Sequence, residues 1–430
     1  MKMSKLAVLK LIFKITLKLK LHIFYAYVIY FYTRRKSKSD NEGVLIFDRV
    51  NSDLPYLMNL NKFNYLFFES KLQYRIASLF LDKEIMSQKN YFSIQNKDYE
   101  NQKADFRNEI FKILKHLKRI GKIKYIIVAN CNYYEHQEWA NAGKDLGIEL
   151  IVYSKESVLP EGRLNAFKKH FNNLSGEIKN IDKILVYGES GYNQFIDSQL
   201  VDKENIFKVG SLKTDYLYEK IKKLNDKGIQ NKGKDITFFA FPCGPFPDKF
   251  DANSFYSQVW QGGYWAPNLW NDCLDLFIKL ANYFPDLNFV IKTKSSDSSK
   301  MIAKQKNVNK NIIFSHDKET WEIYRDSRLI FGFNSTVLLE MITTDIPFFI
   351  PKWHEAENEE LADKMILNNQ SEAYNTYYSK DEMLDALKSY ISDENSVKIK
   401  NSQDARRKII EDHLYKIDGK VGKRILEILN

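Results

Sequence analysis

The chain has 430 residues, 44% of them apolar and 14% aromatic, so it is long enough for two ordinary domains and can bury a core in each. This composition excludes an intrinsically disordered protein. The net charge of +10 does not indicate a general nucleic-acid surface, because the excess lies in residues 1–39, which contain no acid. Three widely spaced cysteines without a Cys-x-x-Cys pair, Cys131, Cys243 and Cys273, indicate reduced thiols in the cytosol.

Residues 1–39 are predicted to form a basic amphipathic helix that lies on a membrane surface. Lysines recur every four residues at Lys10, Lys14 and Lys18, with leucine, isoleucine and phenylalanine between them. The uncharged run 21–33 is too short to span a bilayer, which needs roughly 20 residues. A tilted single span and a soluble helix packed on the body are the alternatives. A signal peptide is disfavoured, because lysines interrupt any apolar core.

Apolar runs that alternate with helical patterns predict a first Rossmann-like domain over residues 40–221. Strands are predicted at 43–47, 124–129, 149–153 and 183–187, and a helix at 106–120. Strands that alternate with helices form parallel, doubly wound sheets. Ligands of such sheets bind beyond the carboxyl ends of the strands, so we expect the polar residues there to face a ligand.

The polar residues after the 124–129 strand include a Glu-His-Gln-Glu run at a predicted helix start. Carboxylates and imidazoles remove protons from hydroxyls near neutral pH, so Glu135, His136 and Glu138 are candidates for the base that activates an acceptor. The same run is also typical of a solvated helix N-terminus, where the helix dipole favours acids. Its spacing does not fit a metal triad, and we expect no metal site.

A polar, lysine-rich linker at 222–235 leads to a second Rossmann-like domain over 236–404. Gly244 follows its first strand and would let backbone N–H groups approach a phosphate. Lys292 and Lys294 share one face at the end of a later strand, where two ammonium groups can converge on a diphosphate.

The stretch 328–352 predicts a strand, a short helix and another strand of a parallel sheet. Asn334, Ser335 and Thr336 place hydroxyls and free N–H groups at the helix start, which favours an anion such as a phosphate. Glu340 follows one turn later, where its carboxylate can accept hydrogen bonds from ribose or sugar hydroxyls. The same residues are also ordinary choices for capping a core helix.

The pattern G-x-N-S-T-x-x-x-E, followed by a short apolar strand with proline, begins at Gly332 and ends at Pro347. It resembles the C-terminal domain of two-domain glycosyltransferases of the GT-B architecture, and most of all bacterial surface-carbohydrate (capsular polysaccharide) biosynthesis proteins. UDP-N-acetylglucosamine 2-epimerases and CDP-glycerol glycerophosphotransferases share that fold. The resemblance therefore implies an α/β fold of two Rossmann-like doubly wound domains, here with an N-terminal amphipathic membrane-binding helix.

The resemblance also implies roles for particular residues. In such families this unit holds the diphosphate and sugar of a nucleotide donor, which is the role implied for Ser335, Thr336 and Glu340. A similar K-x-K at the earlier strand favours a ligand role for Lys292 and Lys294, and His316 is expected near the base or sugar. A last helix at 405–430 is expected to cross back onto the first domain.

We predict a metal-independent glycosyltransferase of surface-polysaccharide synthesis, cytoplasmic and peripheral on the inner face of the cell membrane. Its nucleotide sugar is a substrate and no cofactor is expected. The partners are a lipid-linked or polysaccharide acceptor and anionic lipids, with no nucleic acid. A CDP-polyol phosphotransferase, a nucleotide-sugar 2-epimerase and a non-catalytic carbohydrate-binding or scaffold protein are the alternatives. The sequence contains no motif that is typical of kinases, serine hydrolases or zinc hydrolases.

Overall fold

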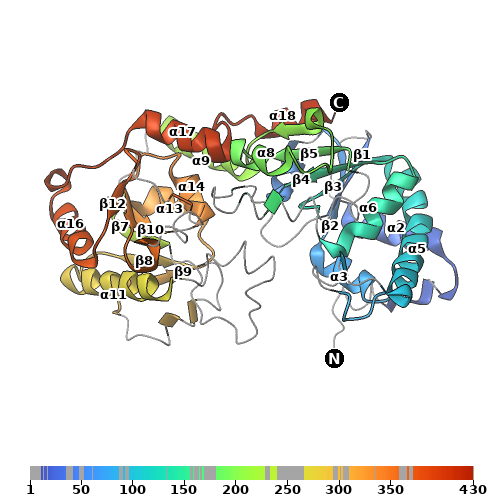
Figure 1. The fold of residues 1–430 in the computed structure, drawn as a ribbon, viewed down its shortest axis with the longest axis horizontal. Helices are drawn as coiled ribbons and strands as arrows, with labels where there is room; N and C mark the ends of the chain where they lie inside the picture. Colours follow the sequence, from blue (N-terminus) through green and yellow to red (C-terminus); the bar gives the residue numbers. More distant parts are fainter. Residues whose placement is uncertain are drawn as a thin grey trace.

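The computed structural model shows two α/β domains joined by helices that run along one side of the molecule (Figure 1). The structure describes residues 11–12, 14–16, 18–34, 42–47, 53–60, 62–86, 91–92, 96–131, 133–154, 158, 164, 167–168, 181–227, 233–239, 266–293, 299–300, 302–303, 309–333, 335–357, 366–367 and 371–429. Within these ranges no helix is both long and apolar enough to cross a bilayer.

The first domain is built on a six-stranded parallel sheet with the order β2-β1-β3-β4-β5-β6. Its strands are β1 (Gly43–Phe47), β2 (Asn64–Phe68), β3 (Ile123–Val128), β4 (Glu149–Tyr153), β5 (Lys183–Val186) and β6 (Ile206–Lys208). Its helices are α2 (His22–Thr33), α3 (Ser70–Ala77), α5 (Lys97–Gly121), α6 (Tyr134–Asp145), α8 (Glu189–Phe195) and α9 (Leu212–Asp226), with 3-10 turns η1 (Leu54–Leu60) and η2 (Lys203–Asn205). Every residue of β1 and β2 is buried, as expected for strands covered on both faces.

The longest helix, α5, shows how the local sequence determines an element of this domain. Its first turn is capped by Asn96, whose side chain accepts a hydrogen bond from the backbone N–H of Asp98 at 2.9 Å. Phe106, Ile110 and Leu114 recur at helical spacing and are fully buried in the domain core. The predicted helical period at 106–120 is therefore confirmed.

The second domain is built on another six-stranded parallel sheet, with the order β12-β11-β10-β7-β8-β9. Its strands are β7 (Asp235–Phe239), β8 (Phe289–Lys292), β9 (Ile312–Ser315), β10 (Ser327–Gly332), β11 (Phe348–Pro351) and β12 (Asn375–Tyr377). Its helices are α11 (Pro267–Tyr283), α13 (Thr320–Asp326), α14 (Thr336–Met341) and α16 (Lys380–Ser392), with 3-10 turns η4 (His354–Glu357) and η5 (Glu394–Ser396). The two parallel sheets confirm the predicted α/β fold of two Rossmann-like domains.

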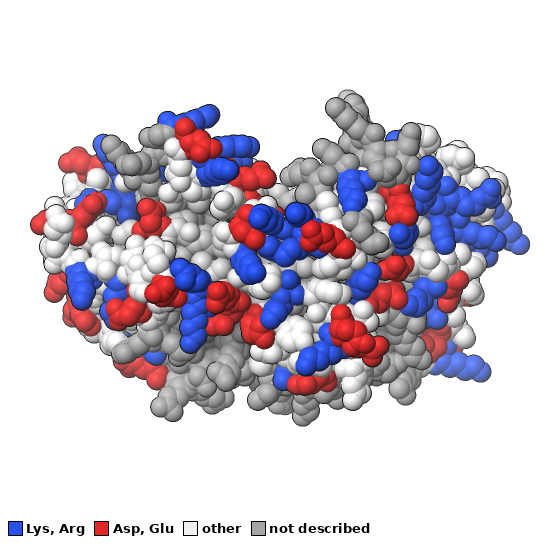
Figure 2. Space-filling view, turned by 90° about the horizontal axis from the view of Figure 1, so that it is seen from above, with Lys and Arg blue, Asp and Glu red and all other residues white. Residues whose placement is uncertain are grey.

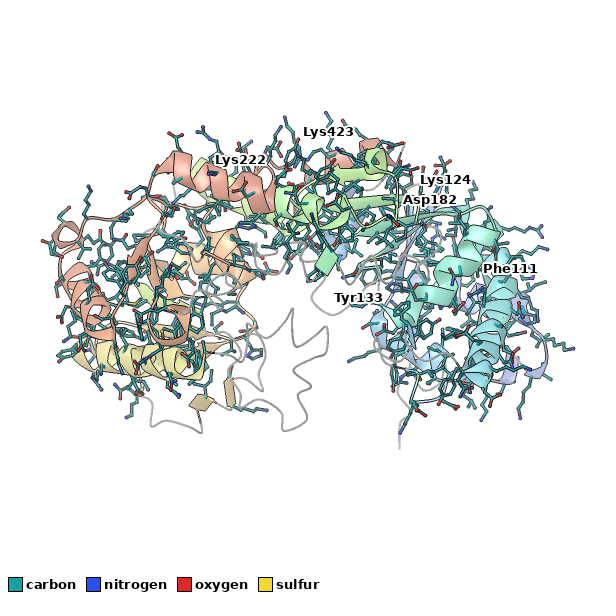
Figure 3. All side chains as sticks on the ribbon, viewed as in Figure 1. Phe111, Lys124, Tyr133, Asp182, Lys222 and Lys423 are labelled. Atoms are coloured by element: carbon teal, nitrogen blue, oxygen red, sulfur yellow. The ribbon has the colours of Figure 1, made fainter. Side chains whose placement is uncertain are left out.

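The end of the chain crosses from the second domain back to the first. Helices α17 (Gln403–Leu414) and α18 (Val421–Ile428) run with α9 along the side of the molecule that connects the two domains, which we call the joined side. Lys222 and Lys423 are labelled there in Figure 3. The sequence had predicted one helix here, but the chain turns at Tyr415, with φ +68°, and at Gly419, with φ +67°. Both angles are left-handed and incompatible with a continuous helix.

A single apolar core continues through both domains and the final helices. It includes Ile127 of the first sheet, Leu338 of the second domain and Ile425 of α18. Polar contacts fix α18 in place, because Arg424 donates to the carbonyl of Val209 at 2.8 Å and the N–H of Gly422 donates to Asp215 at 2.9 Å.

The N-terminal segment is part of the folded first domain. Helix α2 packs on α5 and buries Tyr25, Ala26 and Ile29 in the domain core. His22 contacts Glu109 of α5 at 2.7 Å. The opposite face of α2 is exposed and apolar, so the helix combines packing on the body with a surface that remains available.

We predict that truncating the core side chain of Ile425 destabilises the protein by about 2–5 kcal/mol, because it is 1% exposed and its loss leaves a cavity beneath the first sheet. The free energy of unfolding, measured by urea denaturation of Ile425→Ala, checks this. Lys423→Ala is the matched control, since its side chain is 71% exposed and its change should stay within about 0.5 kcal/mol. Equal effects of the two substitutions would contradict the shared core.

Candidate functional site

Backbone pairing brings the carboxyl ends of four strands of the second sheet level with one another. Gly332 of β10 pairs with Phe239 of β7, which pairs with Lys292 of β8, which in turn pairs with Ser315 of β9. The residues that follow these strands therefore share one edge of the sheet, where open α/β sheets bind their ligands.

Lys292 is the cation at this edge. Its ammonium group donates to the carbonyl of His316 at 2.8 Å and approaches the carbonyl of Thr293 at 3.4 Å. Burial lowers its pKa, while the charges of Asp317, Glu340 and Glu322 partly offset this effect. Among the described residues no carboxylate forms an ion pair with Lys292, so the hydrogen-bonding partners of its charge are neutral carbonyl groups.

The predicted strand–helix–strand unit contributes the other half of the edge. Ser335 precedes the six-residue helix α14, and its side chain makes no capping bond in the structure. Glu340 is 9% exposed, and its Oε2 accepts a hydrogen bond from the hydroxyl of Thr320 at 2.6 Å. Because Glu340 acts on the pKa of Lys292, the two charged groups lie within electrostatic range of each other.

Five of the eight predicted donor-site residues lie at or after strand ends on this edge: Lys292, His316, Ser335, Thr336 and Glu340. The other three, Gly244, Lys294 and Asn334, lie outside the described residues. Within the described ranges no three His, Cys, Asp or Glu side chains could jointly hold a metal ion.

This edge faces the first domain through a direct contact between helices. The hydroxyl of Tyr216, on α9, donates to Glu319 at 2.8 Å, and Glu319 immediately precedes Thr320. Tyr56 of η1 lies with its ring 5.0 Å from that of Tyr216. Burial, together with the charges of Glu319 and Glu340 among others, raises the pKa of Tyr56 to about 12. A first-domain phenol therefore lies near the carboxylate of Glu340.

A second interdomain contact supports the first. The ammonium group of Lys220 lies 5.0 Å from the ring centroids of both Tyr216 and Trp321, so it is held between an aromatic ring from each domain. The indole N–H of Trp321 donates to Glu319 at 2.6 Å. Two side chains, Tyr216 of α9 and Trp321 of α13, thus donate to Glu319, next to the residue that binds Glu340.

On the first-domain side, Glu138 is held in a buried network. Its Oε2 accepts a hydrogen bond from Arg107 at 2.6 Å, and its Oε1 accepts one from the hydroxyl of Tyr91. The Glu138 side chain is 2% exposed. Both carboxylate oxygens therefore have protein partners between α5 and α6, and this geometry favours a structural role over proton abstraction.

His136 and Glu135 lie at the start of α6 but do not form one group with Glu138. Nε2 of His136 contacts the backbone carbonyl of Asn130 at 2.9 Å, and because a carbonyl can only accept, Nε2 carries the proton. The His136 side chain is buried, whereas Glu135 is partly exposed. Tyr133, just before the helix, lies on the side of the first domain that faces the second (Figure 3).

The sequence analysis missed a buried carboxylate at the edge of the first sheet. Oδ2 of Asp53 accepts hydrogen bonds from Tyr153 at 2.7 Å, Tyr187 at 2.9 Å and Ser211 at 3.0 Å. It also accepts the backbone N–H of Leu212 at 3.1 Å. These partners lie at the end of β4 or just after β5 and β6, so Asp53 ties the ends of three strands together. The only local signal was an acid six residues beyond a strand, which does not reveal partners 100 or more residues away.

Comparisons with known proteins are informative only at the level of the fold. No protein-family model and no curated protein matches the chain. MnaA of S. aureus, in a co-structure with UDP, is similar at 10% identity and a TM-score of 0.50, covering 90% of this chain and 96% of its own. A variant of the wall teichoic acid polymerase TagF is similar at 12% identity and a TM-score of 0.50, covering 100% and 98%.

A further similar structure is the UDP-GlcNAc 2-epimerase of Neisseria meningitidis bound to UDP-GlcNAc, at 13% identity and a TM-score of 0.49, covering 90% of this chain and 99% of that one. At such low identities a likeness establishes the architecture alone. The matches to MnaA and TagF confirm a two-domain, GT-B-like α/β fold that spans most or all of the chain.

We predict that Glu138→Gln lowers the free energy of unfolding by about 1–3 kcal/mol, because it leaves Arg107 without its charged partner. Urea denaturation at neutral pH measures this loss. Asp105→Asn, an exposed acid on α5, is the control, and should change stability by less than about 0.5 kcal/mol. A fully stable Glu138→Gln protein would argue against the structural role.

Proposed function

We propose that the protein is a glycosyltransferase that moves a sugar from a nucleotide-sugar donor to an acceptor of surface-polysaccharide synthesis. The proposal rests on the register of β7, β8, β9 and β10, whose carboxyl ends lie side by side. A cation, hydroxyls and a carboxylate therefore follow these strands at one edge of the sheet. That edge also lies against the first domain through Tyr216 and Glu319. A donor held there would be reached by an acceptor from the other domain.

The donor diphosphate would be bound by Lys292 together with Ser335 and Thr336. Their N–H, O–H and ammonium groups would stabilise the negative charge that grows on the departing nucleoside diphosphate. Glu340 would accept hydrogen bonds from sugar or ribose hydroxyls, exchanging its present partner Thr320 for the ligand. His316, exposed beside Lys292, would lie near the base or sugar. Transfer by this set would need no metal, which is a prediction.

Lys294, Asn334 and Gly244 would complete the same site, since all three are neighbours in sequence of residues at this edge. Their contribution stays a prediction from the sequence. The same holds for the acceptor base. Glu135 is the better placed candidate, because it is partly exposed, whereas Glu138 is engaged by Arg107.

The acceptor we propose is a lipid-linked polysaccharide precursor, which places the enzyme on the cytoplasmic face of the cell membrane. A lipid-linked acceptor restricts the reaction to a surface, and a peripheral enzyme meets such an acceptor without crossing the bilayer. The apolar exposed face of α2 supports this location.

The nearest alternative is a CDP-polyol phosphotransferase or a nucleotide-sugar 2-epimerase on the same fold. Both alternatives are supported by the similar structures, since MnaA was solved with UDP and TagF is a wall teichoic acid polymerase. A non-catalytic carbohydrate-binding or scaffold protein is the alternative from another class. At 10–12% identity, the activities of MnaA and TagF cannot be transferred to this chain.

Incubation of the purified protein with a panel of nucleotide sugars and CDP-glycerol, in the presence of a lipid-linked polysaccharide precursor as acceptor, separates these functions. Release of a free nucleoside diphosphate with the sugar attached to an acceptor is the expected result. Release of CMP from CDP-glycerol would identify polyol-phosphate transfer. Release of the nucleoside diphosphate together with a free sugar epimerised at C2 would identify a hydrolysing epimerase. Binding without turnover across the panel would contradict every enzymatic proposal and favour the scaffold.

We predict that Lys292→Ala weakens binding of the panel's nucleotide by about ten- to a hundredfold, the value of a charge-assisted hydrogen bond. Isothermal titration calorimetry measures the affinity. Lys279→Ala, an exposed lysine on α11 of the same domain, is the matched control and should bind as the wild type does. If Lys292→Ala folds and binds normally, the proposed donor site is wrong.

The affinity for the nucleotide should also depend on pH through Lys292. Only the protonated amine attracts the phosphates, and burial lowers its pKa below the ordinary lysine value, so affinity should be full near neutral pH and decline on alkalinisation earlier than an exposed lysine would cause. Lys292→Arg should remove this decline, since a guanidinium stays charged. Calorimetry across the alkaline range, with circular dichroism to verify folding, tests it. A decline that persists in Lys292→Arg would assign the effect elsewhere.

A further inference from the structure

Helix α2 has two apolar faces, of which only one is covered by protein. Tyr25, Ala26 and Ile29 lie in the core of the first domain. On the other side, Phe24 is 54% exposed and Phe31 is 71% exposed. A helix on the surface of a soluble protein normally turns charged residues to solvent, so an apolar outer face needs a partner.

The residues just before α2 also expose apolar side chains. Leu11, Ile15 and Leu19 recur at four-residue spacing and are all about half exposed. The chain turns at Lys20, which has φ +53°, and exposed Leu21 links the two stretches. We call the whole set the apolar face; it consists of Leu11, Ile15, Leu19, Leu21, Ile23, Phe24, Tyr27 and Phe31. Of thirteen exposed large hydrophobic side chains in the described ranges, these are eight, so the exposure is concentrated at one place.

Cationic side chains border the apolar face. We call them the basic rim; it consists of exposed Lys14, Lys18, Lys20, Lys112, Lys115 and Arg119. The last three lie on α5, against which α2 packs, and residues 110–121 of α5 contain no acid. The nearest carboxylate, Glu109, is already bound by His22 and by Lys112. Figure 2 shows Lys and Arg gathered over the end of the molecule that holds the first domain.

We propose that the apolar face and the basic rim together form a docking surface for a bilayer that contains anionic lipids. The aliphatic and aromatic side chains would enter the headgroup–acyl boundary, and the rim would pair with lipid phosphates. A second copy of this chain fits less well, because it would bring two basic rims together.

Docking through this surface would hold the first domain rigidly, unlike a flexible tether. The side chains that meet the lipid and those that fill the domain core belong to the same helix, so α2 cannot leave the body without exposing Tyr25, Ala26 and Ile29. In Figure 1, α2 and α5 lie at the end of the first domain away from the second. The first domain would therefore stand next to the lipid and the donor-binding domain farther from it. The docking surface does not depend on the donor site, and it would stand even if the proposed donor site proved wrong.

Co-sedimentation of the full-length protein with phosphatidylcholine vesicles, with and without phosphatidylglycerol, tests the docking surface. We expect binding to vesicles that contain phosphatidylglycerol, weaker binding to phosphatidylcholine alone, and a decrease with added salt. The double variant Phe24→Glu/Phe31→Glu should lose about tenfold or more in partitioning. Its thermal midpoint should stay close to that of the wild type, because both side chains point away from the core.

The matched control is Tyr283→Glu/Tyr378→Glu, which changes two exposed aromatic residues of the second domain and should leave vesicle binding intact. Absence of wild-type binding to both vesicle types, or equal binding by the two double variants, would overturn the proposal. Since no other protein is present, binding here cannot come from an acidic protein partner. If the protein binds nucleotide but does not bind vesicles, the docking surface is refuted and the donor site is not.

A deletion of residues 1–33 distinguishes rigid docking from a tether. If α2 is part of the domain, the deletion should lower the thermal midpoint of the first domain markedly, because it uncovers the core beneath α2. If the segment were a tether, the shortened protein would keep its midpoint and lose only vesicle binding. That second result would overturn the rigid arrangement.

Discussion

The parallel register of the second sheet is the constraint on which the candidate site depends. Backbone hydrogen bonds place Gly332, Phe239, Lys292 and Ser315 side by side, and none can slip without breaking a ladder. Whatever follows these strands is delivered to one edge. Local sequence decides which side chains arrive there, whereas strand pairing decides that they meet. The site therefore needs no long-range motif, only polar residues at the ends of adjacent strands.

The position of this edge relative to the first domain depends on a different interaction. The two domains share one apolar core, and α17 and α18 carry it across the joined side. Next to that core, Tyr216 contacts Glu319, and the following residue, Thr320, holds Glu340. The contact between domains and the hydrogen bond to Glu340 thus depend on two consecutive residues. Any ligand that takes Glu340 from Thr320 acts on the same turn of chain that joins the domains.

The sequence was sufficient for the sheets and insufficient for the pairings of individual charges. Strands such as β1 and β10 are buried on both faces, so they appear as short apolar runs. The role of Glu138 could not be predicted, because Arg107 lies 31 residues earlier and the intervening residues do not indicate that they meet. Nor could the two faces of α2 be separated, since its buried and its exposed residues are both apolar and the sequence does not tell them apart.

Within the proposed donor site, Lys292 would be a stronger anchor for an anion than the start of α14. A helix of six residues has few aligned peptide groups, and Ser335 adds no capping bond. Lys292 instead holds a charge whose hydrogen-bonding partners are neutral carbonyls, with burial working against that charge. A diphosphate would replace those weak partners with opposite charge and so recover what burial costs. The buried charge of Lys292, whose hydrogen-bonding partners are neutral carbonyls, therefore supports the proposed phosphate site more than the helix turn does.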